Sequence, residues 1–276
     1  SVTSTVYGGK IDEAVVITNA AQIGLTDVTG DPTDPFGLVV LGNIDETKNT
    51  VSILNNGPIN GRLIVVDAGG DVDLVINKSV LGQVYAAGAG NIALSLAEAA
   101  DIAGGVTIQA ARGSKFEVKV DGDVTTTTDI ERGGSAVVEL LGDVGVENKL
   151  SPDGFTGSTV FVLTQGDASV TVGGRTGSVF VDSSGVNDGA DFTQTDTKIV
   201  DKSGAYVQTV ETDLTNAGGA ASLTLLEGAS IFGNASIYGP SGADVMIDGN
   251  ITGAGNSLFV GTRFNAQAAS TTSEVD

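Results

Sequence analysis

The stretch "SILNNGPINGRLIVVDAGGDVDLVIN", residues 52–77, contains short runs of aliphatic side chains separated by clusters of Asn, Gly and Asp. Most of the aliphatic residues occupy alternate positions, the spacing that places side chains on one face of a β-strand. The residues between the runs let the backbone turn sharply, because Gly tolerates a positive φ and Asn and Asp bond to their own backbone. The stretch therefore predicts short strands joined by tight turns, and not helices.

The same pattern recurs along most of the chain, and successive runs begin mostly about 10 or about 21 residues apart. Polar corner clusters at 55–57, 77–79, 121–123 and 141–143 fit a repeat of roughly 20 to 23 residues. Over the whole chain this repeat predicts about 12 stacked coils. The aliphatic runs are 15–17, 51–53, 63–65, 72–76, 92–96, 106–108, 116–120, 137–141, 160–163, 170–172, 179–181, 223–225, 245–247 and 258–260.

Two all-β architectures contain many short strands at this spacing, the parallel β-solenoid and the β-sandwich. A solenoid fills a narrow interior with stacked aliphatic side chains, whereas sandwiches usually contain aromatic core residues and hairpin turns. Aromatic residues make up only 5% of this chain. We therefore predict one β-solenoid domain over residues 1–276, with the β-sandwich as the alternative.

Two regions interrupt the pattern. Residues 27–37, "DVTGDPTDPFG", are rich in Pro, Gly and Asp and predict a surface loop. Residues 186–216 lose the aliphatic runs and become polar and rich in Thr. This second region predicts an excursion from the stack, either a tolerated insertion or the place of binding specificity. In the second case, Phe192 and Tyr206 are the candidate contact residues.

The charge balance restricts the partners. The chain has 34 Asp and Glu against 13 Lys and Arg, a formal net charge of −21, which repels nucleic-acid phosphates and anionic membranes. Nucleic acid is therefore not an expected partner. No apolar run approaches the ~20 residues that cross a bilayer, so no transmembrane segment is expected. The absence of cysteine suits a protein exported from a bacterium.

Three segments carry a resemblance to a known family: "ITNAAQIG" at 17–24, "ILNNGPING" at 53–61 and "VMIDGNITG" at 245–253. They resemble the degenerate Ile-x-Asn-x-Gly-x-Ile-x-Gly coils of bacterial autotransporter passengers and filamentous-haemagglutinin-like adhesins. The resemblance implies a right-handed parallel β-helix, secreted or displayed on a bacterial cell surface.

Composition also restricts catalysis. Without His or Cys, the chain cannot form a Ser/His/Asp triad, a Cys/His dyad or a usual zinc site. Polysaccharide-cleaving β-helices remain an alternative, because they can work with carboxylates or with carboxylates and calcium. The polygalacturonase-like family is marked by adjacent Asp pairs and a Gly-His-Gly element, and this chain has neither. We therefore expect no catalytic residue and no required cofactor.

Calcium is the one metal that the sequence suggests. Asp71 with Asp73, and Asp121 with Asp123, are spaced so that both carboxylates of a pair point to one face of an extended backbone. Calcium could bridge either pair. The alternative is that these residues are solvated corner residues, since Asp is favoured at turns for backbone reasons alone.

Together, these features predict a non-enzymatic structural or adhesive rod on a cell surface. Its expected partners are extracellular glycans or the surface of a host or neighbouring cell. The alternative within the same class is a filament or lattice subunit, in which copies join end to end through unpaired strands.

Overall fold

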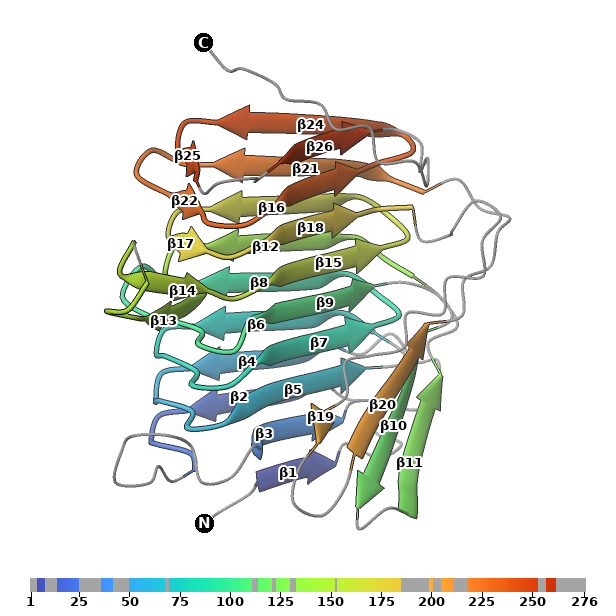
Figure 1. The fold of residues 1–276 in the computed structure, drawn as a ribbon. Helices are drawn as coiled ribbons and strands as arrows, with labels where there is room; N and C mark the ends of the chain where they lie inside the picture. The colour runs from blue at the N-terminus through green and yellow to red at the C-terminus, as the bar shows by residue number, and fades with distance from the viewer. Residues whose placement is uncertain are drawn as a thin grey trace.

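The computed structural model describes residues 4–7, 14–24, 36–41, 50–67, 70–110, 114–120, 123–129, 133–151, 153–184, 199–200, 205–210, 218–252 and 257–261. These residues form an all-β structure without helices, built from strands β1 to β26 (Figure 1). They accordingly include no helix with the length and apolar character needed to cross a bilayer.

Two large sheets contain most of the strands, and every pairing within them is parallel. Sheet A has the order β1 (Ser4–Tyr7), β3 (Phe36–Leu41), β5 (Arg62–Asp67), β7 (Val84–Gly88), β9 (Val106–Ala110), β15 (Val160–Thr164), β18 (Val179–Asp182), β23 (Ala235–Tyr238) and β26 (Leu258–Gly261). Sheet B has the order β2 (Val15–Asn19), β4 (Val51–Asn55), β6 (Val72–Ile76), β8 (Ile92–Leu96), β12 (Ala136–Leu140), β16 (Ala168–Val172), β21 (Ala220–Leu225) and β24 (Gly242–Ile247). Parallel pairing in both sheets differs from the antiparallel layers of the β-sandwich alternative.

The chain passes from a strand of sheet B across a short third side to a strand of sheet A, and then returns to sheet B. We call each such passage a layer, and the eight strands of sheet B define eight layers. In the upper layers the third side consists of β17 (Arg175–Thr176), β22 (Ser230–Ile231) and β25 (Asn250–Ile251). In the lower layers single bridges link Ile23, Ile59, Val80, Ile102 and Val144.

The core lies between these three sides and consists mainly of Val, Ile, Leu and Ala, with the buried polar residues Asn55 and Thr176 at inward positions. Equivalent positions of successive layers stack, as where Leu94 of β8 pairs in register with Val138 of β12, and Val138 with Val170 of β16. Fully burying one such side chain contributes about 1.5–3 kcal/mol. The period of two in the sequence therefore becomes a continuous column of aliphatic contacts across the layers.

Polar corner residues connect the layers through their side chains. At the corner before sheet B, Asp71 Oδ1 accepts a hydrogen bond from the backbone N–H of Asn91 at 2.7 Å. Asn91 Oδ1 accepts from Ser135 N–H at 3.1 Å, and Ser135 Oγ from Asp167 N–H at 3.0 Å. Asp167 Oδ1 accepts from Ala220 N–H at 2.8 Å. Each acceptor side chain thus satisfies a backbone donor of the next layer.

The same arrangement recurs at the third side. Ser79 Oγ accepts from Asp101 N–H at 3.0 Å, and Asp101 Oδ1 from Asp143 N–H at 3.3 Å. Asp143 Oδ1 accepts from Arg175 N–H at 2.7 Å. In each ladder the polar residue directly precedes an inward-facing residue of the core. The side chain at the corner therefore helps to fix the position of the next layer relative to its own. A shorter ladder before sheet A joins Ser178, Asn234 and Ser257.

Glycine at these corners permits close stacking of backbones. A Cβ atom at Gly134 would lie 2.1 Å from the carbonyl oxygen of Gly90 in the layer below. Only six described glycines have a positive φ. Close approach between layers, more than the turn conformation expected from the sequence, therefore explains this corner.

Eight layers are fewer than the ~12 coils that the repeat length predicts. Four of the steps from one strand of sheet B to the next are longer than the repeat, and in three of them described strands form excursions from the stack. The strands in these excursions are β10 (Ser114–Val120) and β11 (Asp123–Asp129), β13 (Gly145–Glu147) and β14 (Phe155–Gly157), and β19 (Ile199–Val200) and β20 (Ala205–Val210).

Two of the excursions combine into one antiparallel sheet, with the order β11-β10-β20-β19. The prediction that 116–120 is a strand of the stack was therefore wrong, because these residues belong to β10. The prediction of a stack corner at 121–123 was also wrong, because Val120 pairs with Asp123 across a β10–β11 connection. Region 186–216 contains β19 and β20. Of the loop expected at 27–37, residues up to 35 lie outside the described ones, and the last two begin β3.

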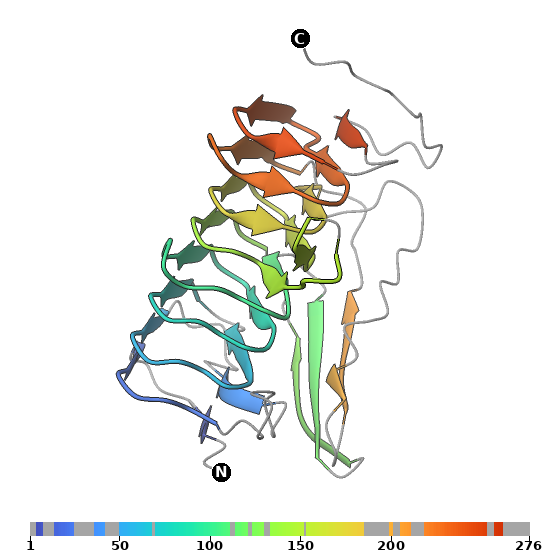
Figure 2. The ribbon, with the colours of Figure 1, turned by 60° about the vertical axis from the view of Figure 1, so that its left-hand side comes forward.

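The outer faces of the two large sheets differ. On β6 and β8, alternate residues face water, whereas Ile64 and Val66 of β5 and Tyr85 and Ala87 of β7 point outward from the core and are nevertheless buried. Strands buried on both faces have continuous apolar runs, as in "LIVV" of β5. Figures 1 and 2 show the four-stranded sheet beside the lower layers, on the side of sheet A. We infer that the two combined excursions cover this apolar face.

The inside and the outside of the stack can be compared on one strand. Val138→Ala should lower the free energy of unfolding by about 2 kcal/mol, because it removes two buried methyl groups and leaves a cavity. Val137→Ala, at the neighbouring position that is 59% exposed, should change it by no more than about 0.5 kcal/mol. Urea denaturation followed by circular dichroism measures both. Equal losses would contradict the assignment of the two faces of β12.

Candidate functional site

A hairpin projects from the stack between the third side and sheet A. It consists of β13 and β14, which pair antiparallel from Gly145 opposite Gly157 to Glu147 opposite Phe155 (Figure 1). In the two layers below, the chain reaches sheet A directly after its bridge residue. The hairpin is therefore an addition to the repeat and not part of the core.

The base of the hairpin is fastened by a group of side chains that we call the clamp: Asp143, Glu147, Phe155, Arg175 and Phe232. Arg175 Nε donates a hydrogen bond to Asp143 Oδ2 at 2.9 Å, and Nη2 donates to both Asp143 and Glu147. The guanidinium carbon lies 4.4 Å from the ring centroid of Phe155, in cation–π contact. The ring of Phe155 in turn packs against Phe232, with the centroids 5.6 Å apart. Residues of three successive layers thus hold one hairpin.

The hydrogen bonds that Arg175 donates to Asp143 and, with a smaller effect, to Glu147 raise the pKa of Arg175, so the cation is favoured at all ordinary pH values. Their contributions to stability differ because the exposed fraction of the side chain is 22% for Asp143 and 72% for Glu147. Solvent screens the second pair strongly. Asp143 and the buried ring of Phe155 therefore provide most of the attachment.

The tip of the hairpin has a defined conformation. Asn148 N–H donates to Gly154 O at 2.9 Å, and Ser151 N–H donates back to Asn148 O at 3.0 Å. The Asn148 side chain accepts from Leu150 N–H at 3.0 Å and donates to Thr156 Oγ1 at 2.8 Å. Gly154 has a φ of 69°, the left-handed conformation that favours glycine. The tip is therefore a closed, hydrogen-bonded turn.

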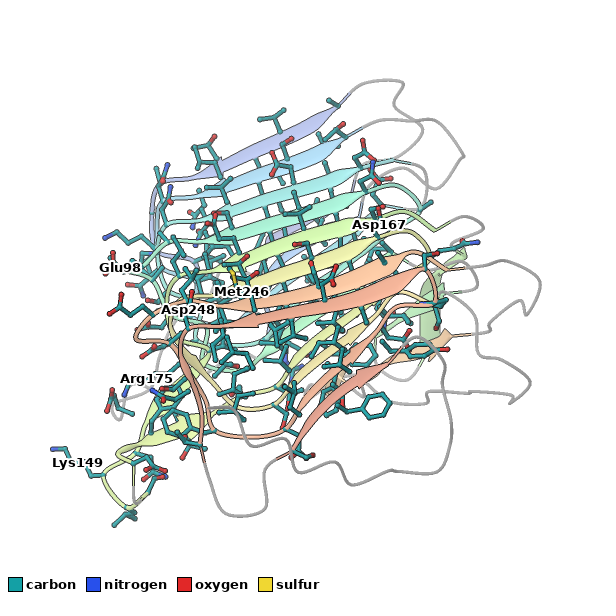
Figure 3. The ribbon with its side chains drawn as sticks, turned by 90° about the horizontal axis from the view of Figure 1, so that it is seen from above. Glu98, Lys149, Asp167, Arg175, Met246 and Asp248 are labelled. Atoms are coloured by element: carbon teal, nitrogen blue, oxygen red, sulfur yellow. The ribbon has the colours of Figure 1, made fainter. Side chains whose placement is uncertain are left out.

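The side chains at this tip face water. Leu150 is 95% exposed and Val146, on β13, is 45% exposed. Lys149 and Asp153 are exposed as well. Seen from above, Arg175 lies close to the stack and Lys149 at the outer end of the hairpin (Figure 3). The arrangement presents an aliphatic side chain at a distance from the stack, with charges beside it.

A second candidate surface is the outer face of sheet A in the upper layers. Phe161 of β15 and Phe180 of β18 are register partners, and Phe259 of β26 follows in the same row after Ser236. These aromatic side chains are partly buried. The neighbouring row contains Leu163, Asp182 and Tyr238.

Asp182 is the carboxylate with a distinctive environment in this row. Burial raises the pKa of Asp182, while hydrogen bonds from Ser184 oppose the rise; its Oδ1 accepts from Ser184 N–H at 2.8 Å. The adjacent Ser183 Oγ donates to Gly219 O at 2.9 Å. These bonds close the point at which the chain leaves β18 and returns to β21. The geometry indicates a structural role in holding the two ends of that excursion together.

The carboxylates expected to bind calcium are only partly described. Asp71 and Asp73 are both exposed, and one oxygen of Asp71 is already used in the corner ladder. Asp121 lies outside the described residues, and Asp123 begins β11 without a described side chain. Among the residues that the structure describes, no three His, Cys, Asp or Glu side chains come together as a metal site would require.

The expected contact aromatics are described even less. Phe192 lies outside the described residues. Tyr206 lies in β20 opposite Ile199, and its side chain is not among those described. Neither residue can therefore be placed on a surface, and their role as contacts stays a prediction.

Sequence reasoning missed the clamp and the aromatic row. The row had a signal, since Phe alternates with inward Val in "VFVL" at 160–163 and "VFVD" at 179–182. The clamp had none, because Arg175 reaches its partners only through the stacking of layers. No protein-family model, curated protein or solved structure matches this chain.

Removal of the clamp cation should loosen the hairpin selectively. In Arg175→Gln, the amides of Leu150, Ser151 and Gly154 should exchange several-fold faster, because their turn loses its attachment to the stack. Core amides such as that of Val138 should keep their protection. Hydrogen–deuterium exchange measures both, and Lys78→Gln at an exposed corner is the matched loss of a cation. Unchanged exchange at the tip would contradict the role of the clamp.

The buried carboxylate of Asp182 predicts a pH effect. A raised pKa in the folded state means that folding takes up a proton, so this group increases stability as pH falls through its folded pKa towards its ordinary value. Asp182→Asn retains the acceptor for Ser184 and removes the charge. The variant should therefore be at least as stable as the parent at pH 7, with the advantage shrinking on acidification. Thermal melts across pH measure this, and a variant clearly less stable than the parent at pH 7 would contradict it.

Proposed function

We propose that the chain is a right-handed parallel β-helix that acts as a non-enzymatic scaffold, secreted or displayed on a cell surface. In this function the stack provides a rod and the excursions provide the contacts. The partners are extracellular glycans or proteins on a host or neighbouring cell.

The observation that carries this proposal is the arrangement of the layers. Strands of successive layers pair in parallel, and this pairing fixes the positions at which the excursions leave the stack. Eight layers at a spacing of about 4.8 Å give a body roughly 40 Å long. Stacked layers of this kind position the loops that leave them, as in other repeat proteins. The clamp adds a specific attachment where the hairpin leaves the stack.

Composition and resemblance support the location. The chain lacks cysteine and carries a net charge of −21, which suits a soluble surface in an external medium. The segments at 17–24, 53–61 and 245–253 resemble bacterial surface adhesins.

The end-to-end filament is the second candidate. Val15 and Ile17 of β2, and Val245 and Ile247 of β24, are inward residues that are only partly buried in the terminal layers. Such edges can pair with another copy.

The scaffold function predicts binding without turnover. The purified chain should bind intact cells or immobilised glycans and should release no new reducing ends or unsaturated sugars from pectin or alginate. Asp71→Asn and Asp73→Asn should leave binding unchanged within about 2-fold, because single exposed side chains contribute little. Product formation that these variants abolish would establish the enzyme alternative instead. Absence of binding to every cell and glycan tested would contradict the scaffold.

A further inference from the structure

The hairpin presents the most exposed large hydrophobic side chain of the described residues. Leu150 is 95% exposed at the tip, and Val146 on the same hairpin is 45% exposed. Neither side chain contributes to the core of the stack. Both side chains therefore remain available for contact with another molecule.

The exposed side chain is held in place and does not hang from a loose loop. The backbone of Leu150 is fixed by Asn148, and Ser151 closes the same turn. The base is held by the clamp through Arg175 and Phe155. A group fixed in one conformation loses less entropy when it binds, which is the general advantage of preorganised contacts.

We propose that the β13–β14 hairpin is a recognition arm that inserts Leu150 into an apolar pocket of a partner protein with a neutral or basic rim. This inference rests on the proposed function as a binding scaffold. Protein–protein interfaces place apolar side chains at their centre and polar residues at their rim. Around Leu150 the polar residues are Asn148, Lys149 and Asp153.

Charge selects the class of partner. The chain carries a net charge of −21, so a second copy or an anionic membrane would be repelled. Glu147 and Asp153 add exposed negative charge beside the arm. Membrane binding also needs a larger apolar face with basic residues, whereas this tip has only Lys149. A protein pocket with a neutral or basic rim fits these constraints.

Site-specific photo-crosslinking tests the arm on the full chain. The photoreactive residue p-benzoylphenylalanine replaces Leu150 in one sample and the exposed Val137 of sheet B in the control. The probe is the set of surface and secreted proteins of the producing organism. We expect one discrete adduct at position 150 that is absent at position 137. The cross-linked protein is then purified, and its dissociation constant for the unmodified chain and its variants is measured.

The affinities decide the proposal. Leu150→Asp should weaken binding at least ~30-fold, as expected for a hot-spot residue, and Leu150→Met should stay within about 3-fold. Val137→Asp, with an equal change of charge on another surface, should bind like the parent. Circular dichroism should be the same for all variants, because both positions face water.

Three outcomes would contradict the proposal that the hairpin is a recognition arm. Equal affinity of Leu150→Asp would refute it and leave the scaffold function intact, provided that the chain still binds cells. Binding to phosphatidylcholine or phosphatidylglycerol vesicles that depends on Leu150 would replace the protein partner by a membrane. If no adduct forms at position 150 while cell binding persists, the scaffold binds through another surface.

Discussion

The constraint on which this structure depends is the parallel pairing of each layer with the next in constant register. A shift by one residue would turn every inward side chain of a strand outward. Val72 and Leu74 of β6 therefore stack on aliphatic residues in both β4 and β8, and Ile76 stacks on Leu96 of β8 and on the buried Asn55 of β4. Hydrogen bonds satisfy the backbone between layers, and aliphatic columns fill the interior. Only the outer faces and the connections are free to vary between layers.

The two outer faces use this freedom differently. The outer face of sheet B is exposed to water and carries charged residues such as Asp73 and Glu139 together with aliphatic ones such as Val137. On sheet A, Ile64 and Tyr85 are apolar and buried, so that sheet requires a second layer of structure. The excursions after β9 and β18 leave the stack from sheet A and share one antiparallel sheet. The apolar outer face of sheet A and the long excursions that cover it therefore depend on each other.

The sequence predicts local features well because they depend on neighbouring residues. Alternation identified β6 and β8, and polar clusters marked corners such as that at 77–79. The number of layers could not be predicted, because the alternating "FEVKV" of β10 has the same pattern as a strand of the stack. β10 pairs with its neighbour β11 and with β20, far along the chain, and the alternation alone does not distinguish these pairings from those of a layer. The clamp could not be predicted from the sequence for the same reason, because Asp143 and Arg175 belong to successive layers and come into contact only when these layers stack.

The hydrogen-bond ladders at the corners also affect which residues are available for binding. Asp71, Asp101, Asp143 and Asp167 form an acidic series in the sequence, yet in each case a carboxylate oxygen accepts a backbone N–H of the next layer. Loss of one of these acceptors frees a backbone donor of the next layer, and that bond is exposed to water for Asp71, Asp101 and Asp167 and partly buried for Asp143. These carboxylates therefore already have a structural role, whereas groups that no layer requires can change without disturbing the stack. Leu150, held away from the stack by its own hairpin, belongs to this second kind.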